Sequence, residues 1–208
     1  MKNFFLAGLL FCSMLSASAQ SQGDVRFGVT GGMNVSNITD LDADCRIGFN
    51  LGARIEYGIT DNLYFGSGLL FSQKGYEKEY SGIEDGTLVN FKLKGNPLYL
   101  QIPIQLGYHH NLSNNVGLFA ETGPYLAFGI AGKNKAEASI PGVASVSEKE
   151  DFFGSDAANV FDMGWGLRAG VNVSKFQIHL GYEYGFTKVA DDTSCHNSNF
   201  NVGLTYFF

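Results

Sequence analysis

The stretch NFNVGLTYFF, residues 199–208, decides the fold class. Its apolar residues alternate with polar ones, which is the pattern of a β-strand with two different faces. A strand that ends on an aromatic residue is typical of bacterial outer-membrane barrels, in which the last strand pairs with the first. The alternative is an edge strand of a soluble β-sandwich. The apolar face, which we interpret as the C-terminal signal for barrel assembly, consists of Phe200, Val202, Leu204, Tyr206 and Phe208.

The N-terminus has the three parts of a secretory signal peptide. Lys2 precedes an apolar run at residues 4–15 that is too short to span a bilayer, and Ala17-Ser18-Ala19 follows as an A-x-A cleavage site. The alternative, a lipoprotein signal at Cys12, places a phenylalanine where a small residue is expected. We therefore expect a signal peptide at 1–19 and one barrel domain at 20–208.

The amino-acid composition further narrows the class of protein. The chain has 27 Gly, 18 Phe, 10 Tyr and only 4 Pro, with a net charge of −6. No basic patch is visible, so nucleic acid is not an expected partner. No apolar run after the signal peptide is long enough for a transmembrane helix. A signal peptide without such a helix leaves a soluble secreted protein or a closed membrane barrel.

The mature chain divides into eight alternating segments joined by short and long connections in turn. The segments span residues 25–37, 47–59, 63–76, 91–112, 116–132, 160–173, 176–189 and 199–208. Turns at 60–62, 113–115 and 174–175 alternate with longer connections at 39–46, 77–90, 133–159 and 190–198. This arrangement predicts an all-β, eight-stranded antiparallel up-and-down transmembrane barrel with short periplasmic turns and longer extracellular loops.

The polar face of these segments separates a membrane barrel from a soluble lipocalin-like barrel. It combines many glycines with sparse charges of both signs, whereas lysines gather in loops and at strand ends. This composition suits a narrow interior in which each buried charge has a partner, and not a water-facing surface. We expect the network to plug the lumen, with a gated channel as the alternative. The predicted lumenal charges are Arg26, Arg54, Glu56, Glu121, Asp162, Arg168 and Glu183.

Four short motifs carry a family resemblance. They are LYLQIP at 98–103, GPYL at 123–126, FDMG at 161–164 and GYEYG at 181–185. In order and spacing they resemble the PorT-like outer-membrane barrels of Bacteroidetes, over essentially all of residues 23–208. The resemblance implies one eight-stranded barrel and no catalytic residues. One founding member of that family is linked to a secretion system, so the resemblance also implies an accessory role in secretion as one candidate.

Cys45 and Cys195 are the only cysteines after the signal peptide. They lie in the first and last outer loops, which become neighbours when the barrel closes, and the compartment is oxidising. We predict a disulfide between Cys45 and Cys195, with two unpaired thiols as the alternative.

Candidate catalytic residues are few. His196 with Ser194 and Asp192 forms the only set on the outer side, and proximity in sequence does not make a catalytic site. A metal site at His196, Asp191 and Asp192 has no stronger support. We expect no enzyme activity, metal or cofactor.

The sequence therefore predicts a monomeric, non-enzymatic barrel of the bacterial outer membrane that acts in protein interaction or envelope structure. Expected partners are outer-membrane lipid, the barrel-assembly machinery during insertion, and a protein bound through the extracellular loops. The long connection at 133–159 is expected to be irregular, and it either contacts another molecule or is solvated. Alternatives are an enzyme that modifies outer-leaflet lipid and a narrow gated channel.

Overall fold

The computed structural model describes residues 22–39, 43–84, 87–140, 144–153, 158–189 and 194–208. No helix in these ranges is long and apolar enough to cross a membrane. The strands are β1 (Val25–Ile38), β2 (Asp44–Gly58), β3 (Leu63–Gln73), β4 (Tyr76–Glu84), β5 (Thr87–Gly95), β6 (Leu98–Asn111), β7 (Val116–Ala131), β8 (Lys133–Ile140), β9 (Ala144–Asp151), β10 (Phe161–Val173), β11 (Phe176–Lys188) and β12 (His196–Phe207).

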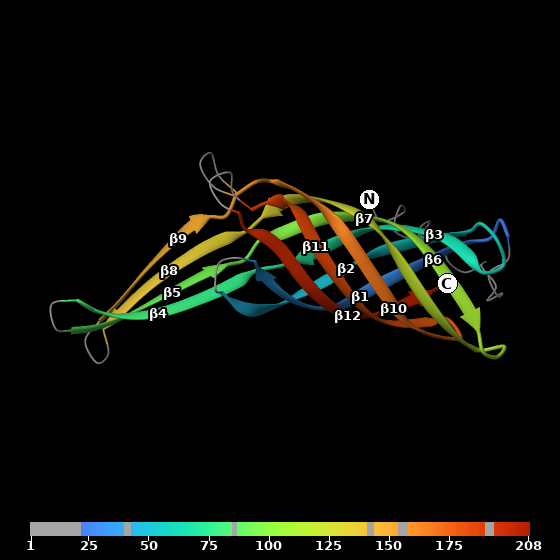
Figure 1. Cartoon of the computed structure of the whole chain (residues 1–208), viewed down its shortest axis with the longest axis horizontal. Helices are drawn as coiled ribbons and strands as arrows, with labels where there is room; N and C mark the ends of the chain where they lie inside the picture. Colours follow the sequence, from blue (N-terminus) through green and yellow to red (C-terminus); the bar gives the residue numbers. More distant parts are fainter. Residues whose placement is uncertain (1–21, 40–42, 85–86, 141–143, 154–157, 190–193) are drawn as a thin grey trace, which may run out of the picture.

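Eight of these strands close into a barrel, as the sequence predicts (Figure 1). The ring runs β1-β2-β3-β6-β7-β10-β11-β12 and returns to β1, with antiparallel pairing throughout. The closing pair β1–β12 extends from Gly28 opposite Phe207 to Ile38 opposite Asn197. A closed ring leaves no unpaired backbone edge within the barrel wall.

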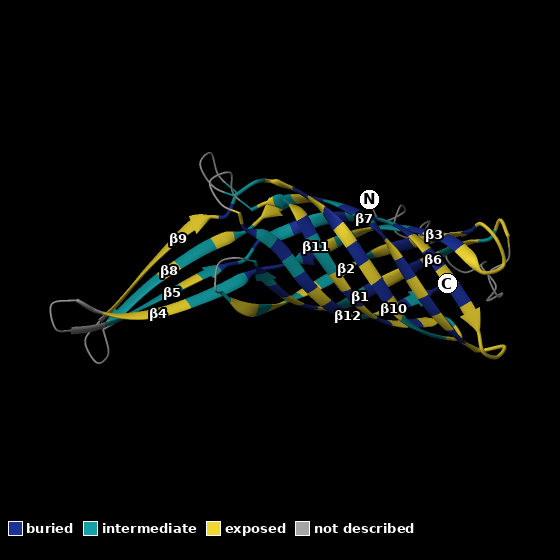
Figure 2. Cartoon of the chain, viewed as in Figure 1, coloured by how far each residue is buried: buried dark blue, intermediate teal, exposed yellow. Residues whose placement is uncertain are grey.

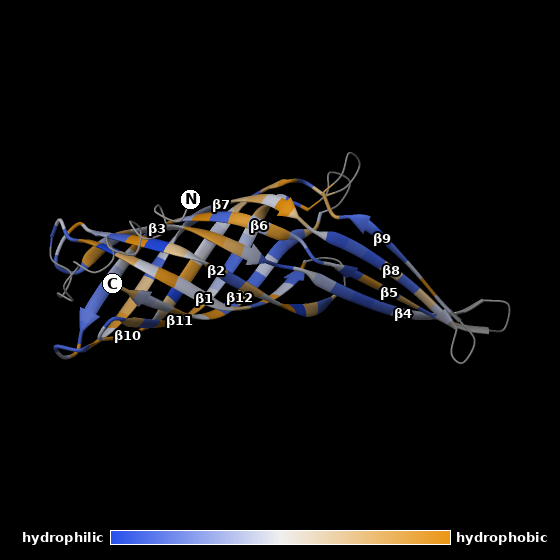
Figure 3. Ribbon diagram, turned by 180° about the vertical axis from the view of Figure 1, so that it is seen from behind, coloured by the Kyte–Doolittle hydropathy of each residue, from blue (hydrophilic) through white to orange (hydrophobic). Residues whose placement is uncertain are grey.

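The barrel carries apolar side chains outside and polar side chains inside, the reverse of a soluble protein. Figure 2 shows exposed and buried residues alternating along each strand, and Figure 3 shows the apolar residues on the barrel wall. Ile47 and Leu51 are 67% and 57% exposed, whereas Asn34 and Glu56 are fully buried. The outward face of the last strand is likewise exposed at Phe200. An apolar exterior of this kind is the surface that lipid covers.

The short turns lie at one end of the barrel together with the C-terminus. Thr60 shapes the first turn, because its hydroxyl accepts hydrogen bonds from the backbone N–H of Asn62 and of Leu63. Ser174 adopts a left-handed conformation with φ 53° in the turn before β11. The N–H of Phe208 donates to the carbonyl of Phe27, which holds the C-terminus against β1.

Two of the connections expected as loops are instead strands. The described residues of 77–90 and 133–159 lie mostly in two hairpins, β4–β5 and β8–β9, and β5 pairs with β8. The result is a four-stranded sheet, β4-β5-β8-β9, that continues beyond the barrel (Figure 1). The segment expected at 91–112 is accordingly two strands, β5 and β6, separated at Asn96 and Pro97. The prediction of an irregular loop at 133–159 is therefore wrong for β8 and β9.

Candidate functional site

The lumen holds a charge cluster in the half of the barrel nearest the short turns. We call it the Glu121 cluster, and it comprises Arg26, Arg54, Glu56, Glu121 and Arg168. Glu121 accepts from Nη2 of Arg54 and faces Nη1 of Arg168 at 3.0 Å. Glu56 bridges Arg54, at 3.1 Å from Nε, and Arg26. Both carboxylates are fully buried, so these contacts offset the cost of removing them from water.

Aromatic and amide side chains complete the Glu121 cluster. The hydroxyl of Tyr64 donates to Glu121 at 2.7 Å, and Tyr64 stacks on His109 with ring centroids 4.1 Å apart. Gly107 makes room for this tyrosine, because a Cβ there would lie 2.1 Å from the ring. Nη1 of Arg54 donates to Gln105 at 3.2 Å. An eight-stranded barrel has an interior just wide enough for side chains such as these to fill.

A second cluster surrounds Lys74 nearer the extracellular mouth. Its ammonium nitrogen lies 3.7 Å from a carboxylate oxygen of Asp162 and 3.7 Å from one of Glu183. The same nitrogen lies 4.4 Å from the centre of the Tyr125 ring, whose hydroxyl donates to Asp162 at 3.1 Å. Asn199 donates to Glu183 at 3.1 Å. Lys74 is therefore a buried cation held by two carboxylates and an aromatic face.

An aromatic cap covers the Lys74 cluster. Phe153 packs against Tyr99 and Tyr125, and Phe152 is 2% exposed. A Cβ at Gly129 would lie 2.2 Å from the Phe153 ring, so only glycine leaves space for the cap there. The cap comes from the residues that follow β9, which ties the extracellular sheet to the lumen.

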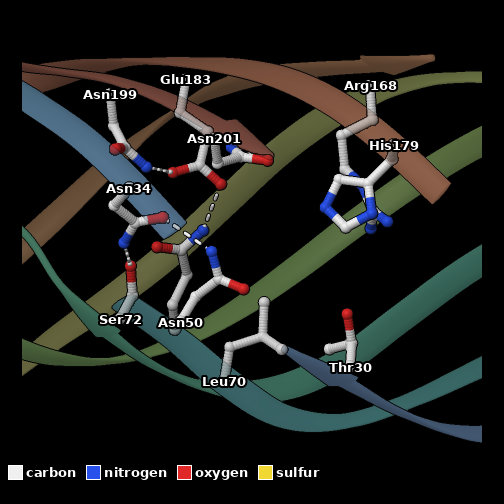
Figure 4. A pocket seen from close by; sticks show the side chains of 11 residues that line it. Thr30, Asn34, Asn50, Leu70, Ser72, Arg168, His179, Glu183, Asn199 and Asn201 are labelled. Atoms are coloured by element: carbon white, nitrogen blue, oxygen red, sulfur yellow. Dashed lines mark hydrogen bonds between the residues drawn. The ribbon is translucent and has the colours of Figure 1, made fainter. Parts of the chain in front are cut away.

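A small polar cavity separates the two clusters. Its volume is about 20 Å³, which is room for about one water molecule. Figure 4 shows amides on one side, where Asn34 donates to Ser72 and Asn50 donates to Asn34, with Arg168 and His179 on the other. The volume is far below that of a pocket for a small-molecule ligand.

The structure places all seven charges predicted for the lumen on the inner face, in two groups. Five form the Glu121 cluster, whereas Asp162 and Glu183 belong to the Lys74 cluster. Sequence reasoning missed Lys74, the Tyr125 ring and the Phe152–Phe153 cap. Lys74 could have been found, because it continues the inward-facing alternation of β3 after Ser72. The cap had no such signal, since it depends on the path of β9.

The extracellular sheet β4-β5-β8-β9 has two chemically different faces. One row across its four strands is apolar and runs through Tyr80, Phe91, Ala138 and Val146. Tyr80 and Phe91 stack with ring centroids 5.0 Å apart. Tyr80 is 49% and Val146 71% exposed, and the neighbouring Leu93 on the same face is 39% exposed. We call this surface the apolar face.

The opposite face of the sheet is charged. Nζ of Lys94 lies 3.4 Å from Glu77, and Lys92 pairs with both Glu77 and Glu79. The pKa of Glu77 is lowered, first because Lys92 donates a hydrogen bond to it and then because Lys94 does so too. Lys135 pairs with Glu137 on the same face. These residues form a charge ladder, which keeps this face in water.

The remaining predicted sites do not assemble in the described residues. Cys45 is exposed and Cys195 buried, and both are free thiols in the structure, so the predicted disulfide is not formed there. His196 stacks on Tyr184 at 5.8 Å, while Asp191 and Asp192 lie outside the described residues. The described part of the chain holds no group of three or more His, Cys, Asp or Glu that could bind a metal. The signal peptide predicted at 1–19 also lies outside it.

Comparisons with known proteins agree with the architecture. Residues 18–191 match the family model described as outer membrane protein beta-barrel domain. No curated protein sequence matches the chain.

Several solved structures are similar at low identity. The attachment invasion locus protein Ail of Yersinia pestis is 19% identical, with a TM-score of 0.41, over 90% of this chain and 99% of that protein. Neisserial surface protein A is 15% identical, with a TM-score of 0.43, over 88% and 97%. OprG from Pseudomonas aeruginosa is 13% identical, with a TM-score of 0.42, over 92% and 99%.

Proposed function

Since this chain belongs to the outer membrane protein beta-barrel domain family, we propose that its filled barrel anchors a protein-interaction surface outside the cell. The protein is an integral β-barrel of the bacterial outer membrane. Its interaction surface is the apolar face of the sheet β4-β5-β8-β9, and its role is not enzymatic.

The observation that carries this proposal is the uncovered apolar face. Strand β4 alone has nine residues, so the sheet reaches about 30 Å at about 3.3 Å per residue. Leu93 lies opposite Lys78, about 7 Å beyond the rim pair Tyr76–Cys45, and Tyr80 lies about 13 Å beyond it. Tyr80, Leu93 and Val146 remain exposed there. Contiguous exposed apolar side chains in water mark an interaction site.

The lumen supports an anchor better than a channel. Four cations, Arg26, Arg54, Lys74 and Arg168, face four carboxylates inside the wall. The cavity between them has room for about one water molecule. A lipid-modifying enzyme has less support, because no set of candidate catalytic side chains comes together in the described residues at the outer rim.

A sharper form of the proposal is an accessory role in secretion, as the PorT-like resemblance implies. The strongest motif of the PorT-like resemblance lies in β6, where Tyr99 and Gln101 point into the lumen. Gln101 donates to Glu183 at 2.7 Å, and Tyr99 packs against Phe153. The motif therefore has a packing role in the barrel, and the secretion role rests on the resemblance alone.

The test uses protein extracted gently from outer membranes, crosslinked and sized on native gels. We expect a complex larger than the lone barrel, and Leu93→Glu should release the partner because it adds a charge to the apolar face. Lys149→Glu, on the opposite face, serves as the matched control and should retain the complex. A wild-type protein that migrates as the lone barrel would contradict a stable complex.

A further inference from the structure

Strand β9 ends the extracellular sheet with an open edge. We propose that β9 binds an extended, basic segment of a partner protein, which adds to the sheet as a fifth strand. This inference rests on the proposed interaction function and specifies the partner's chemistry. Strand addition of this kind uses main-chain hydrogen bonds for affinity and alternate side chains for specificity.

The two outer edges of the sheet differ in access. Tyr76 and Glu77 at the start of β4 pair with Cys45 and Asp44 of β2, so the barrel rim occupies that end of the β4 edge. Among the described strands, β9 pairs with β8 alone and has its other edge free over its length. Its Val146 is the most exposed large apolar side chain of the described residues. Beyond Glu77 the outer edge of β4 also lacks a strand partner among the described residues, and β9 differs in being free over its whole length and in the exposure of Val146.

The side chains of β9 define what can pair with it. Val146, Glu148 and Glu150 share the apolar face, because Val146 lies opposite Ala138 and Glu148 opposite Ala136. Within the described residues, neither Glu148 nor Glu150 forms a salt bridge, although every acidic side chain of β4 and β8 with a described environment does. Opposite charges on directly opposed strands are stabilising. A strand beside β9 is thus favoured when it places an apolar residue opposite Val146 and basic residues opposite the two glutamates.

Strand β9 of a second copy of this chain does not meet that requirement. On the apolar face, β9 of another copy would again offer Val146, Glu148 and Glu150, and no cation. Every pairing register that aligned the two faces would leave at least one glutamate facing an apolar or acidic residue. The complementary strand is therefore not β9 of a second copy, and the proposal assigns it to a different protein.

The test uses full-length protein in detergent micelles and a fluorescent synthetic peptide, TKTKTVT. Run antiparallel to β9, this peptide places its lysines opposite Glu150 and Glu148 and its valine opposite Val146. We expect saturable binding by fluorescence anisotropy. An isomer with adjacent lysines, TTKKTVT, should bind up to about fivefold more weakly, because one lysine then points to the opposite face.

Peptide backbones identify the binding mode without changing the protein. Two N-methylated versions of TKTKTVT are compared. In one version the N–H groups that point to one edge of the peptide strand are methylated, and in the other version those that point to the opposite edge are methylated. Strand addition predicts that one version loses binding and the other retains it. If both bind equally well, or neither wild-type nor variant protein binds the parent peptide, the inference is overturned.

Protein variants test the charges. The double variant Glu148→Lys, Glu150→Lys should bind the peptide about tenfold more weakly. Lys149→Glu, on the other face, should change the affinity for the peptide less than about twofold. A photo-crosslinker placed at Leu93 or at Val146 in cells separates the two proposals. If the peptide fails to bind but Leu93 captures a partner, strand addition falls and the interaction function stands. If the peptide fails and neither position captures a partner, both fall.

Discussion

Glu121→Gln is the substitution that tests whether the lumenal network stabilises the barrel. Glu121 accepts from Arg54 and Tyr64 and faces Arg168. The glutamine has nearly the same shape, so the change removes a charge and leaves packing intact. Arg54 keeps Glu56 as a partner, at 3.1 Å, whereas Arg168 loses its only carboxylate within the described residues.

The expected loss follows from the burial of the groups left behind. The side chain of Arg168 is 9% exposed and that of Glu121 is fully buried. Removing one partner of a buried ion pair costs about 3–5 kcal/mol, because the remaining charge has no compensation. We expect E121Q to lower the free energy of unfolding by an amount in this range. Adding Arg168→Met removes the excess cation, so the double variant should be more stable than the sum of the single effects predicts.

The assay is urea unfolding of the barrel refolded into lipid vesicles, followed by the gel shift between folded and unfolded forms. Glu79→Gln is the matched control, because Glu79 pairs with Lys92 on the solvent-exposed charge ladder and its loss should leave the midpoint unchanged. E121Q within about 1 kcal/mol of the wild type would refute the reasoning, since the lumen would then tolerate an unpaired buried cation.

Three further outcomes follow from the structure. Because the pKa of Glu77 is lowered, its ion pairs stabilise the sheet fully above the ordinary glutamate pKa, and this stabilisation is lost as the pH falls through the lowered pKa. Amide hydrogen exchange in β4 and β5, corrected for the intrinsic exchange rate, should therefore rise in acid. E77Q should abolish this pH dependence. Phe208→Ala should reduce insertion into the outer membrane, measured by the folded band on cold gels, whereas Leu112→Ala, an equally apolar change at an exposed turn, should not. Thiol titration of unreduced, denatured protein should find two reactive thiols, because Cys45 and Cys195 are both free in the structure, and a titration that finds none would restore the disulfide prediction.

Much of the barrel was predictable because its signal is local. A strand places successive side chains on opposite faces, so the alternation in residues 47–59 alone distinguishes a lipid face from a lumenal face. The same alternation continues in the hairpins, for example from Tyr76 to Tyr80, but both faces there meet water and the pattern is weaker. For this reason the sequence reasoning assigned the extracellular strands to loops.

The sequence by itself determined the membrane barrel, its strand order and seven of the charges that point inward, with Lys74 missed. The tertiary structure alone decided which of those charges meet, because Arg54 and Glu121 are 67 positions apart and come together only across the closed lumen. It also decided that Phe152 and Phe153 cap Lys74 and that β9 has a free edge. These features depend on the packing of distant strands against one another, and no periodicity within a single strand encodes them.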